Sequence, residues 1–275
     1  MKTTQSIPEI RSRERNDLVQ KLTAHLQQDN RVRAAWLAGS IARGEDDWLS
    51  DIDLYVAVTD ESIEEVVQGR HEFAAQPVTP TLSMDQMRNA PPRGGYLLVH
   101  YPGEYGPQHV DWFWQPESLA SLPDDGLLLF DKAGLSIIDG KIWEKEMNQT
   151  GSRPAIDSTD HVDLLTHDLA FFWAMSLIVA KYIVRGDDET VGHMVGLIER
   201  TLDRIIESLG IAEHSSGEQG SSVKGQVAQF QVLRRASDRA KSLHGNLRDR
   251  GVVVPAEAIA EVERFFDACE SVVSG

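Results

Sequence analysis

Three aspartates in the first half of the chain have the type and spacing that metal-assisted chemistry requires. Asp51 and Asp53 are two residues apart, and Asp111 lies alone in the apolar segment 110–114. Positions i and i+2 of a strand point to the same side, so the first two carboxylates meet as like charges unless a cation neutralises them. All-oxygen ligands of this kind suit Mg²⁺, which keeps room for water and phosphate oxygens. If the strand of Asp111 lies beside the other strand, the three carboxylates converge.

Each aspartate also has an ordinary structural explanation. Asp51 can begin its strand as a turn residue, Asp53 can face water, and Asp111 can pair with an arginine. A segment twelve residues before Asp51 weighs against these explanations, because it has the composition of a phosphate-binding turn.

That segment contains Gly39, Ser40 and Arg43. A glycine at the end of a strand lets backbone N–H groups approach a phosphate without obstruction by a Cβ atom, and the Ser40 hydroxyl adds a donor. The Arg43 guanidinium can pair with phosphate charge. A Gly-Ser turn alone is common in any fold, so it indicates a function only through its spacing along the chain from the aspartates.

These residues need strands to hold them, and the hydrophobic pattern predicts such strands. Residues 51–58 alternate, with apolar side chains on one face and the aspartates on the other. Ser6 and Glu9 have the spacing of a capping box at the start of a helix with leucines every four residues. The pattern predicts helices at 7–28 and 62–75, strands at 33–38, 51–58, 96–101, 109–114 and 127–130, and a hairpin around the Gly/Pro turn 102–107.

From about residue 160 onward the pattern is helical throughout. The spacing predicts helices at 161–185, 188–209, 226–244 and 255–272, with a polar loop at 213–224. The change in character falls near residues 150–158. The sequence therefore predicts an α/β domain at 1–150 and an all-α domain at 151–275.

The run Gly39-Ser40, ten residues, Asp51-Ile52-Asp53, followed by the isolated Asp111, resembles the DNA polymerase beta-like nucleotidyltransferase superfamily. Within it, the chain looks most similar to the small bacterial antibiotic nucleotidyltransferases of the aminoglycoside or lincosamide type. The likeness covers about residues 30–135. It implies an α+β fold, with a mixed sheet and helices, followed by a helical bundle domain.

The same resemblance implies an activity. A nucleoside monophosphate, with AMP from ATP as the first choice, would pass from an NTP to an acceptor hydroxyl with release of pyrophosphate. Asp51 and Asp53 would hold two Mg²⁺ ions and the triphosphate. Asp111 would bind the metal nearer the acceptor and help deprotonate its hydroxyl. Glu104, at the hairpin turn, has the chemistry of a separate base, although a glutamate in a Gly/Pro turn is usually just solvated. Gly39, Ser40 and Arg43 would bind the nucleotide.

Two cations of the helical half are further candidates for the nucleotide site. Lys181 and Arg185 are four residues apart near a helix end, and related transferases place basic residues of a helical domain over the triphosphate. Cations in the last turn before a glycine are also favoured by the helix dipole alone, so both explanations stay open.

Charge and composition limit the partners. There are 27 Lys and Arg against 43 Asp and Glu, a net charge of −16, which disfavours nucleic acid and would attract a cationic, aminoglycoside-like acceptor. The negative charge can equally serve solubility alone. A single cysteine, Cys269, excludes an intramolecular disulfide and fits a reducing cytoplasm. The apolar run 169–180 is too short for a membrane span, so we expect no membrane partner. For the oligomeric state we expect a monomer or a homodimer.

Two alternatives to a small-molecule acceptor remain. The acceptor can be a protein, as in antitoxin-like transferases of the same superfamily. The chain can also be a nucleotide-binding module without turnover, although a complete set of three aspartates disfavours that alternative.

Overall fold

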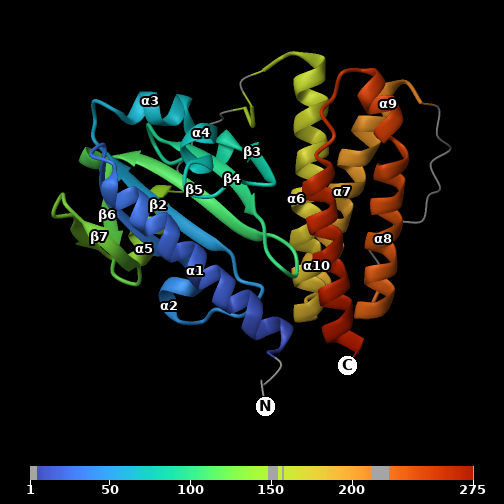
Figure 1. Ribbon diagram of the computed structural model, residues 1–275, viewed down its shortest axis with the longest axis horizontal. Helices are drawn as coiled ribbons and strands as arrows, with labels where there is room; N and C mark the ends of the chain where they lie inside the picture. Colours follow the sequence, from blue (N-terminus) through green and yellow to red (C-terminus); the bar gives the residue numbers. More distant parts are fainter. Residues whose placement is uncertain (1–4, 148–153, 157, 212–222, 275) are drawn as a thin grey trace. The chain divides into compact units, whose positions relative to one another are not determined.

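The structure of the protein, a computed structural model, describes residues 5–147, 154–156, 158–211 and 223–274 (Figure 1). The chain divides into two compact units, Met1–Asp157 and Ser158–Gly275. The first is a mixed sheet with helices and the second is helical, which confirms the predicted α+β class. Residues 212–222, most of the predicted polar loop, lie outside the described residues.

The elements of the first unit follow one another in this order: α1 (Ile7–Gln28), β1 (Val32–Ala38), α2 (Gly39–Arg43), β2 (Ile52–Val58), α3 (Ile63–Gln68), α4 (Arg70–Ala75), β3 (Leu82–Asp85), η1 (Met87–Asn89), β4 (Gly95–Tyr101), β5 (Gln108–Pro116), η2 (Glu117–Leu119), β6 (Ser121–Pro123), β7 (Leu127–Asp131), β8 (Ser136–Ile138) and α5 (Gly140–Met147). The second unit consists of α6 (His161–Arg185), α7 (Asp188–Leu209), α8 (Gln226–Ser242), α9 (His244–Asp249) and α10 (Ala256–Ser274).

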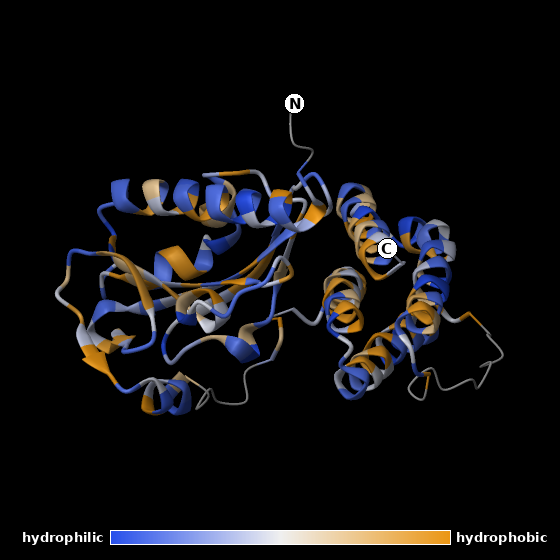
Figure 2. Cartoon of the chain, turned by 90° about the horizontal axis from the view of Figure 1, so that it is seen from below, coloured by the Kyte–Doolittle hydropathy of each residue, from blue (hydrophilic) through white to orange (hydrophobic). Residues whose placement is uncertain are grey.

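A six-stranded sheet with the order β3-β4-β5-β2-β1-β7 forms the centre of the first unit. Strands β2 and β5 are parallel neighbours, and every other adjacent pair in this sheet is antiparallel. The predicted hairpin is confirmed by the pairing of β4 with β5. The strands are largely apolar, whereas helix α1 also has many hydrophilic residues (Figure 2). This is the pattern of a sheet buried between layers.

The two faces of the sheet are covered differently. On one face, buried side chains of α1, α3 and α4 pack against alternate residues of the strands, among them Leu54, Val99 and Trp112. On the other face, Trp143 of α5 packs with Trp36 and Tyr55, together with apolar residues around β6 and β8. Alternation along β2 and β5 therefore sends their aspartates to the face that α5 covers only in part.

Helix α1 begins with the predicted capping box. The backbone N–H of Ser6 donates to Oε2 of Glu9 at 2.8 Å, and the N–H of Glu9 donates to the Ser6 hydroxyl. Two buried arginines then fix the segments around the candidate site. Arg15 donates to the carbonyl of Asp47 and pairs with Asp46 in the loop before β2. Helix α1 therefore aligns that loop as well as covering the sheet.

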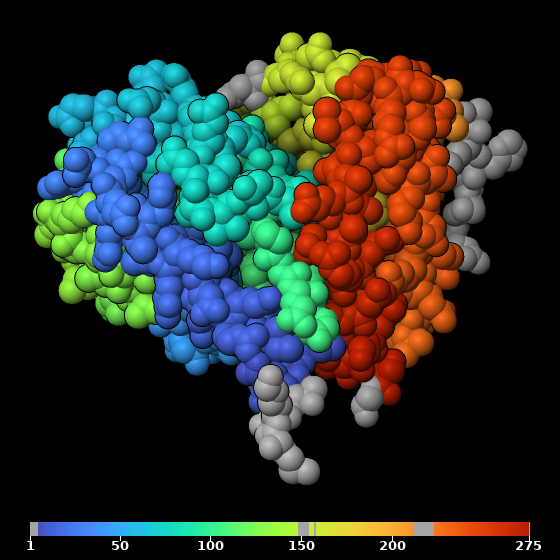
Figure 3. All heavy atoms as spheres, in the orientation of Figure 1, coloured from blue at the N-terminus to red at the C-terminus, as the bar shows by residue number. Residues whose placement is uncertain are grey.

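The second buried arginine, Arg11, holds the β4–β5 turn. Its guanidinium donates to three carbonyls of residues 105–107 at 2.8 to 3.0 Å. In Figure 3 the atoms of α1 (blue) lie against those of this turn (green). Buried carbonyls that lose their donor carry an uncompensated desolvation cost, so this contact sets the turn's conformation.

Replacement of Arg11 by Met should lower the free energy of unfolding by about 2–4 kcal/mol, because several buried carbonyls lose their donor at once. Urea denaturation followed by circular dichroism measures the change. Arg13→Met, at an exposed position of the same helix, should change stability by no more than about 0.5 kcal/mol. Equal effects of the two substitutions would contradict the assignment.

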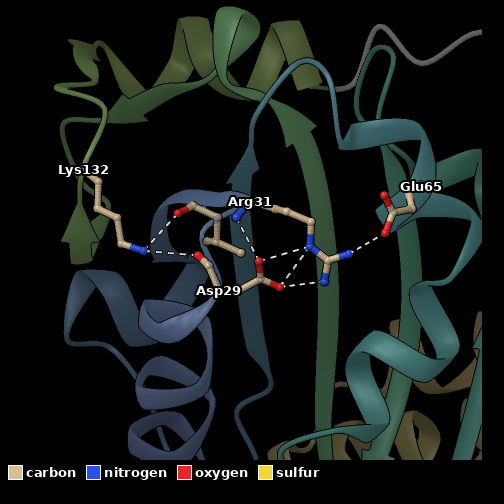
Figure 4. Close-up of polar contacts among 5 residues, drawn as sticks. Asp29, Arg31, Glu65 and Lys132 are labelled. Atoms are coloured by element: carbon tan, nitrogen blue, oxygen red, sulfur yellow. Dashed lines mark hydrogen bonds and ion pairs between the residues drawn. The ribbon is translucent and has the colours of Figure 1, made fainter.

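A polar network ties the other end of the sheet together (Figure 4). Arg31 donates to both carboxylate oxygens of Asp29, at 3.1 and 2.7 Å, and to Glu65 of α3 at 2.8 Å. Lys132, just after β7, donates to carbonyls at the end of α1 and the start of β1. These contacts join α1, β1, α3 and β7 at the end of the sheet opposite Asp53, since Val32 pairs with Val58 and Ala38 pairs with Asp53.

The helical unit packs around α6, which contacts α7, α8 and α10. Asp160 caps the start of α6, and Gly186 ends it in the left-handed conformation. By length and composition, α6 is the one helix among the described residues that could cross a membrane. Of its most apolar stretch, 56% is buried, as expected of the central helix of a bundle.

Two predicted helices are interrupted in the structure. Residues 62–75 form α3 and α4 rather than one helix, because the chain leaves the helical conformation at Gly69. The predicted helix 226–244 ends at Ser242, and the short helix α9 follows. Both differences lie away from the aspartates.

Candidate active site

Asp53 and Asp111 lie directly opposite each other on adjacent strands. In the parallel register of β2 and β5, Asp53 is the partner of Asp111 and Ile52 is the partner of Val110. Adjacent strands are about 4.8 Å apart, so the two side chains leave the sheet side by side on the same face. Asp51 immediately precedes β2 and is half-buried. The structure thus brings the three predicted aspartates to one region of the sheet.

The predicted phosphate-binding turn lies against Asp53. Gly39 begins α2 with φ +69°, and a Cβ atom at this position would overlap Oδ2 of Asp53 and lie 3.3 Å from its Cγ. Only glycine therefore allows the backbone to lie over the carboxylate. Ser40 follows at the start of α2 and is half-buried. The turn and the aspartates form one site rather than two separate features.

The close approach of two acids changes their protonation. Burial and the negative charge of Asp111 raise the pKa of Asp53 to about 7. Burial also acts to raise the pKa of Asp111, but the His109 ring and the Tyr96 hydroxyl outweigh it and lower that pKa. Below about pH 7, Asp53 thus holds a proton while Asp111 stays ionised, as expected where two carboxylates share a site.

Two residues that the sequence did not indicate surround Asp111. Nε2 of His109 lies 3.1 Å from Oδ1 of Asp111, and Nδ1 of the same ring lies 4.0 Å from Oδ1 of Asp51. The Tyr96 hydroxyl donates to the same Oδ1 of Asp111. Burial and the charge of Asp111 raise the pKa of Tyr96 well above its usual value, so the hydroxyl keeps its proton. His109 shows no metal-ligand spacing in the sequence, but it is two residues before Asp111 on the same strand, a spacing that places both side chains on one face.

An aromatic row lies next to the carboxylates on the same face. Trp36, Tyr55, Phe113 and Tyr96 come from the four neighbouring strands β1, β2, β5 and β4. Successive ring centroids are 5.6, 4.2 and 5.1 Å apart. Phe113 is only half-buried. Rings in stacked or edge-on contact fix one another, so the row gives β2 and β5 a rigid surface beside the acids.

The remaining predicted residues are placed as follows. Arg43 is exposed and pairs with Glu45 at 2.8 Å. Glu104 is exposed in the β4–β5 turn, where its backbone N–H donates to Glu14. Glu104 thus has no described contact with the three aspartates.

The two cations of the helical unit differ in environment. Lys181 is buried, with 2% of its surface exposed, whereas Arg185 is exposed in the last turn of α6 and stacks over Tyr182 at 5.9 Å. They do not present two charges together at the surface, as their spacing had suggested. Their role in nucleotide binding stays a prediction.

The carboxylate oxygens of the three aspartates are ligands that suit a divalent cation, but the side chains are not already arranged around a metal position. Within the part of the chain that the structure describes, no group of three or more His, Cys, Asp or Glu side chains is gathered closely enough to hold a metal ion. Two facing carboxylates that offer only oxygen atoms are best held together by positive charge. A magnesium-type ion would supply that charge.

Comparison with known proteins agrees with this geometry. Residues 20–92 match the family model described as "Polymerase beta, Nucleotidyltransferase". The matched segment contains the Gly39-Ser40 turn, Asp51 and Asp53, and it ends before Tyr96, His109 and Asp111. No curated protein matches the chain. The match supports the DNA polymerase beta-like superfamily for this domain, with nucleotidyl transfer as its general activity.

Proposed function

We propose that the protein is a Mg²⁺-dependent nucleotidyltransferase that transfers AMP from ATP to a hydroxyl of a small polar acceptor. The observation that carries the proposal is the pairing of Asp53 with Asp111 beneath the Gly39 turn. In-line transfer of a nucleotidyl group depends on placing charge at the attacking and leaving oxygens. Paired acids beside a glycine turn meet that requirement.

Each residue has a separate task in this proposal. Asp51 and Asp53 would hold two Mg²⁺ ions, and Asp111 would hold the one nearer the acceptor. The bound ions would supply positive charge to the triphosphate and to the leaving pyrophosphate. Asp111, the acid that stays ionised, would accept the proton of the acceptor hydroxyl. Gly39 and Ser40 would place backbone and hydroxyl donors at the phosphates. The Arg43 guanidinium would leave Glu45 and pair with a phosphate group instead.

A cationic acceptor is part of the proposal. The chain carries a net charge of −16, and acidic residues exceed basic ones in both units. Such a field raises the local concentration of cations and speeds their encounter with the site. The resemblance to antibiotic nucleotidyltransferases makes an aminoglycoside-like polyamine with free hydroxyl groups the first acceptor to test. We also propose a cytoplasmic location, where an NTP is available and Cys269, which is buried in α10, stays reduced.

The proposal is tested by measuring pyrophosphate release with each of the four NTPs, Mg²⁺ and a panel of acceptors. The panel pairs hydroxylated polyamines with neutral polyols of matched size, and mass spectrometry identifies the product. We expect ATP and a cationic acceptor to give pyrophosphate and a nucleotidylated small molecule. Added salt should slow the reaction of the polyamine more than that of the polyol, because screening acts on the charged acceptor.

Other outcomes point to other functions. Label recovered in a protein instead of a small molecule would replace the small acceptor with a protein acceptor. NTP binding without pyrophosphate release across the whole panel would contradict the transferase proposal and favour a nucleotide-binding module. Release that is equal for polyamine and polyol would retain the transferase but contradict a cationic acceptor.

A further inference from the structure

Asp111 is held by one of its two carboxylate oxygens. The Tyr96 hydroxyl and Nε2 of His109 both lie within hydrogen-bond distance of Oδ1. Among the described residues no donor contacts Oδ2. The two donors come from different strands, β4 and β5, and so approach Oδ1 from two directions. An oxygen with two fixed donors defines the plane and tilt of the whole carboxylate.

The two donors are themselves fixed by packing. Tyr96 is 3% exposed, and its ring packs edge-on against Phe113 of the aromatic row. His109 is 4% exposed, and its ring lies 5.2 Å from that of His100, which is also buried. Neither donor can turn away without disturbing the ring packed against it. The arrangement is therefore rigid before any substrate arrives.

We propose that Tyr96 and His109 are positioning residues that orient Asp111 by Oδ1 and so leave Oδ2 as the oxygen that would hold the acceptor-side cation. This inference rests on the proposed function, because it assigns a task to the carboxylate that the reaction uses. His109 has a second contact that fits the same task. Its Nδ1 lies 4.0 Å from Oδ1 of Asp51, beyond hydrogen-bond distance, so the ring lies between the first and third acids.

The orientation matters because ligands of a metal are tuned by the groups that hold them. Loss of such a group usually lowers metal affinity or activity by about 10–100-fold, even though the ligand itself remains. A purely structural role predicts something different. In that case removal of a donor lowers the stability of the fold but leaves metal affinity and the rate of transfer per folded molecule unchanged.

Tyr96→Phe is the first test, because it removes the donor and keeps the ring. We expect kcat to fall by about 10–100-fold, KM for the NTP to change by less than about twofold, and Mn²⁺ affinity in calorimetry without acceptor to fall by about tenfold. The matched control is Tyr101→Phe. Tyr101 is also buried in the sheet, but its hydroxyl donates to the carbonyl of Ala74 in the helix-covered core. It should change stability only.

His109 is tested with two substitutions that differ in reach. His109→Gln can place an amide donor where Nε2 stood, whereas His109→Asn is too short to do so. We expect Gln to retain most of the kcat and the Mn²⁺ affinity, and Asn to lose about 10–100-fold of both. His71→Asn is the matched control. His71 bonds Ser83 and Asp85 near the edge strand β3, away from the three aspartates.

The outcomes separate this inference from the proposed function. If the wild-type protein releases no pyrophosphate with any acceptor, the proposed function fails, while Mn²⁺ calorimetry still tests the positioning of Asp111. If the wild type is active but Tyr96→Phe and His109→Asn keep its kcat and Mn²⁺ affinity, the inference is overturned. Should His109→Asn fail to fold, Tyr96→Phe decides the matter. Equal losses in His109→Gln and His109→Asn would also overturn the role of His109.

Discussion

Replacing Asp53 with Asn should abolish nucleotidyl transfer and at the same time stabilise the metal-free protein above pH 7. Transfer should fall by at least about 10³-fold, since a missing carboxylate removes several kcal/mol of charge stabilisation in the transition state. Stability should rise because the substitution removes the repulsion between Asp53 and Asp111. Pyrophosphate release and urea denaturation in the presence of a chelator measure the two effects.

The pH dependence fixes the sign of the stability change. Burial and the charge of Asp111 raise the pKa of Asp53 in the folded protein to about 7, with His109 and Arg43 opposing the shift. Between the ordinary carboxyl pKa and pH 7, the folded state holds a proton that the unfolded chain has released. Stability therefore falls as pH rises through this window and levels off above it. Because Asp53 is half-buried, we expect the free energy of unfolding to fall by a total of about 1–3 kcal/mol across this window. This is less than the full pKa shift of Asp53 would give.

Asp53→Asn should flatten this slope, and Mg²⁺ should stabilise the wild type above pH 7 but not the variant. The matched control is Asp60→Asn, just beyond the far end of β2, where Asp60 accepts hydrogen bonds from Ser118. It should keep the activity. An Asp53→Asn variant that is less stable than the wild type at pH 8 without metal would contradict the shared-site account, and one that retains a tenth of the activity would contradict the catalytic role.

Most of the helices follow from local signals in the sequence. Helices α1, α6 and α7 begin and end where the sequence predicted, because each has a side-chain N-cap, and α6 and α7 each end at a glycine in the left-handed conformation. The break at Gly69 was missed because the apolar spacing continues through it. Short elements without clear alternation, such as β3, β6, β8 and α5, were not predicted at all.

Strand order was the part of the fold that local pattern could not supply. The sequence predicts each strand by its own alternation, but the parallel pairing of β2 with β5 joins residues almost sixty positions apart. Which strands become neighbours depends on how the whole sheet buries its two faces. The mixed character of the sheet came instead from the family resemblance.

The candidate site divides in the same way. Asp51, Asp53 and Asp111 could be selected from the sequence because acids are unusual beside buried strand residues. Tyr96 could not, since tyrosine is common in strands and its relation to Asp111 exists only in the register of β4 and β5. His109 was missed although it is two residues before Asp111 on the same strand, a spacing that places both side chains on one face. Local sequence thus indicates the acids and one of the two groups that contact Asp111, and tertiary structure is needed for the other.

Replacing Gly39 with Ala should remove both activity and much of the stability. The residue has φ +69°, which costs a residue with a Cβ about 1–2 kcal/mol, and the new Cβ would overlap the Asp53 carboxylate, which adds about 1–3 kcal/mol. Displacing the acid by about 1 Å is enough to lower transfer by about 10²-fold. Thermal unfolding and pyrophosphate release measure the two losses.

Gly44 provides the control for backbone strain, because it caps the other end of α2. Its φ is +67°, but a Cβ there would meet no atom within 4 Å. Gly44→Ala should therefore show the strain alone and keep most of the activity.

Adding Asp53→Ala to Gly39→Ala should restore stability toward that of Gly44→Ala without restoring transfer, because the overlapping oxygen is gone. If Gly39→Ala and Gly44→Ala are equally stable and equally active, the turn does not lie over Asp53, and the site loses the contact that joins its two halves.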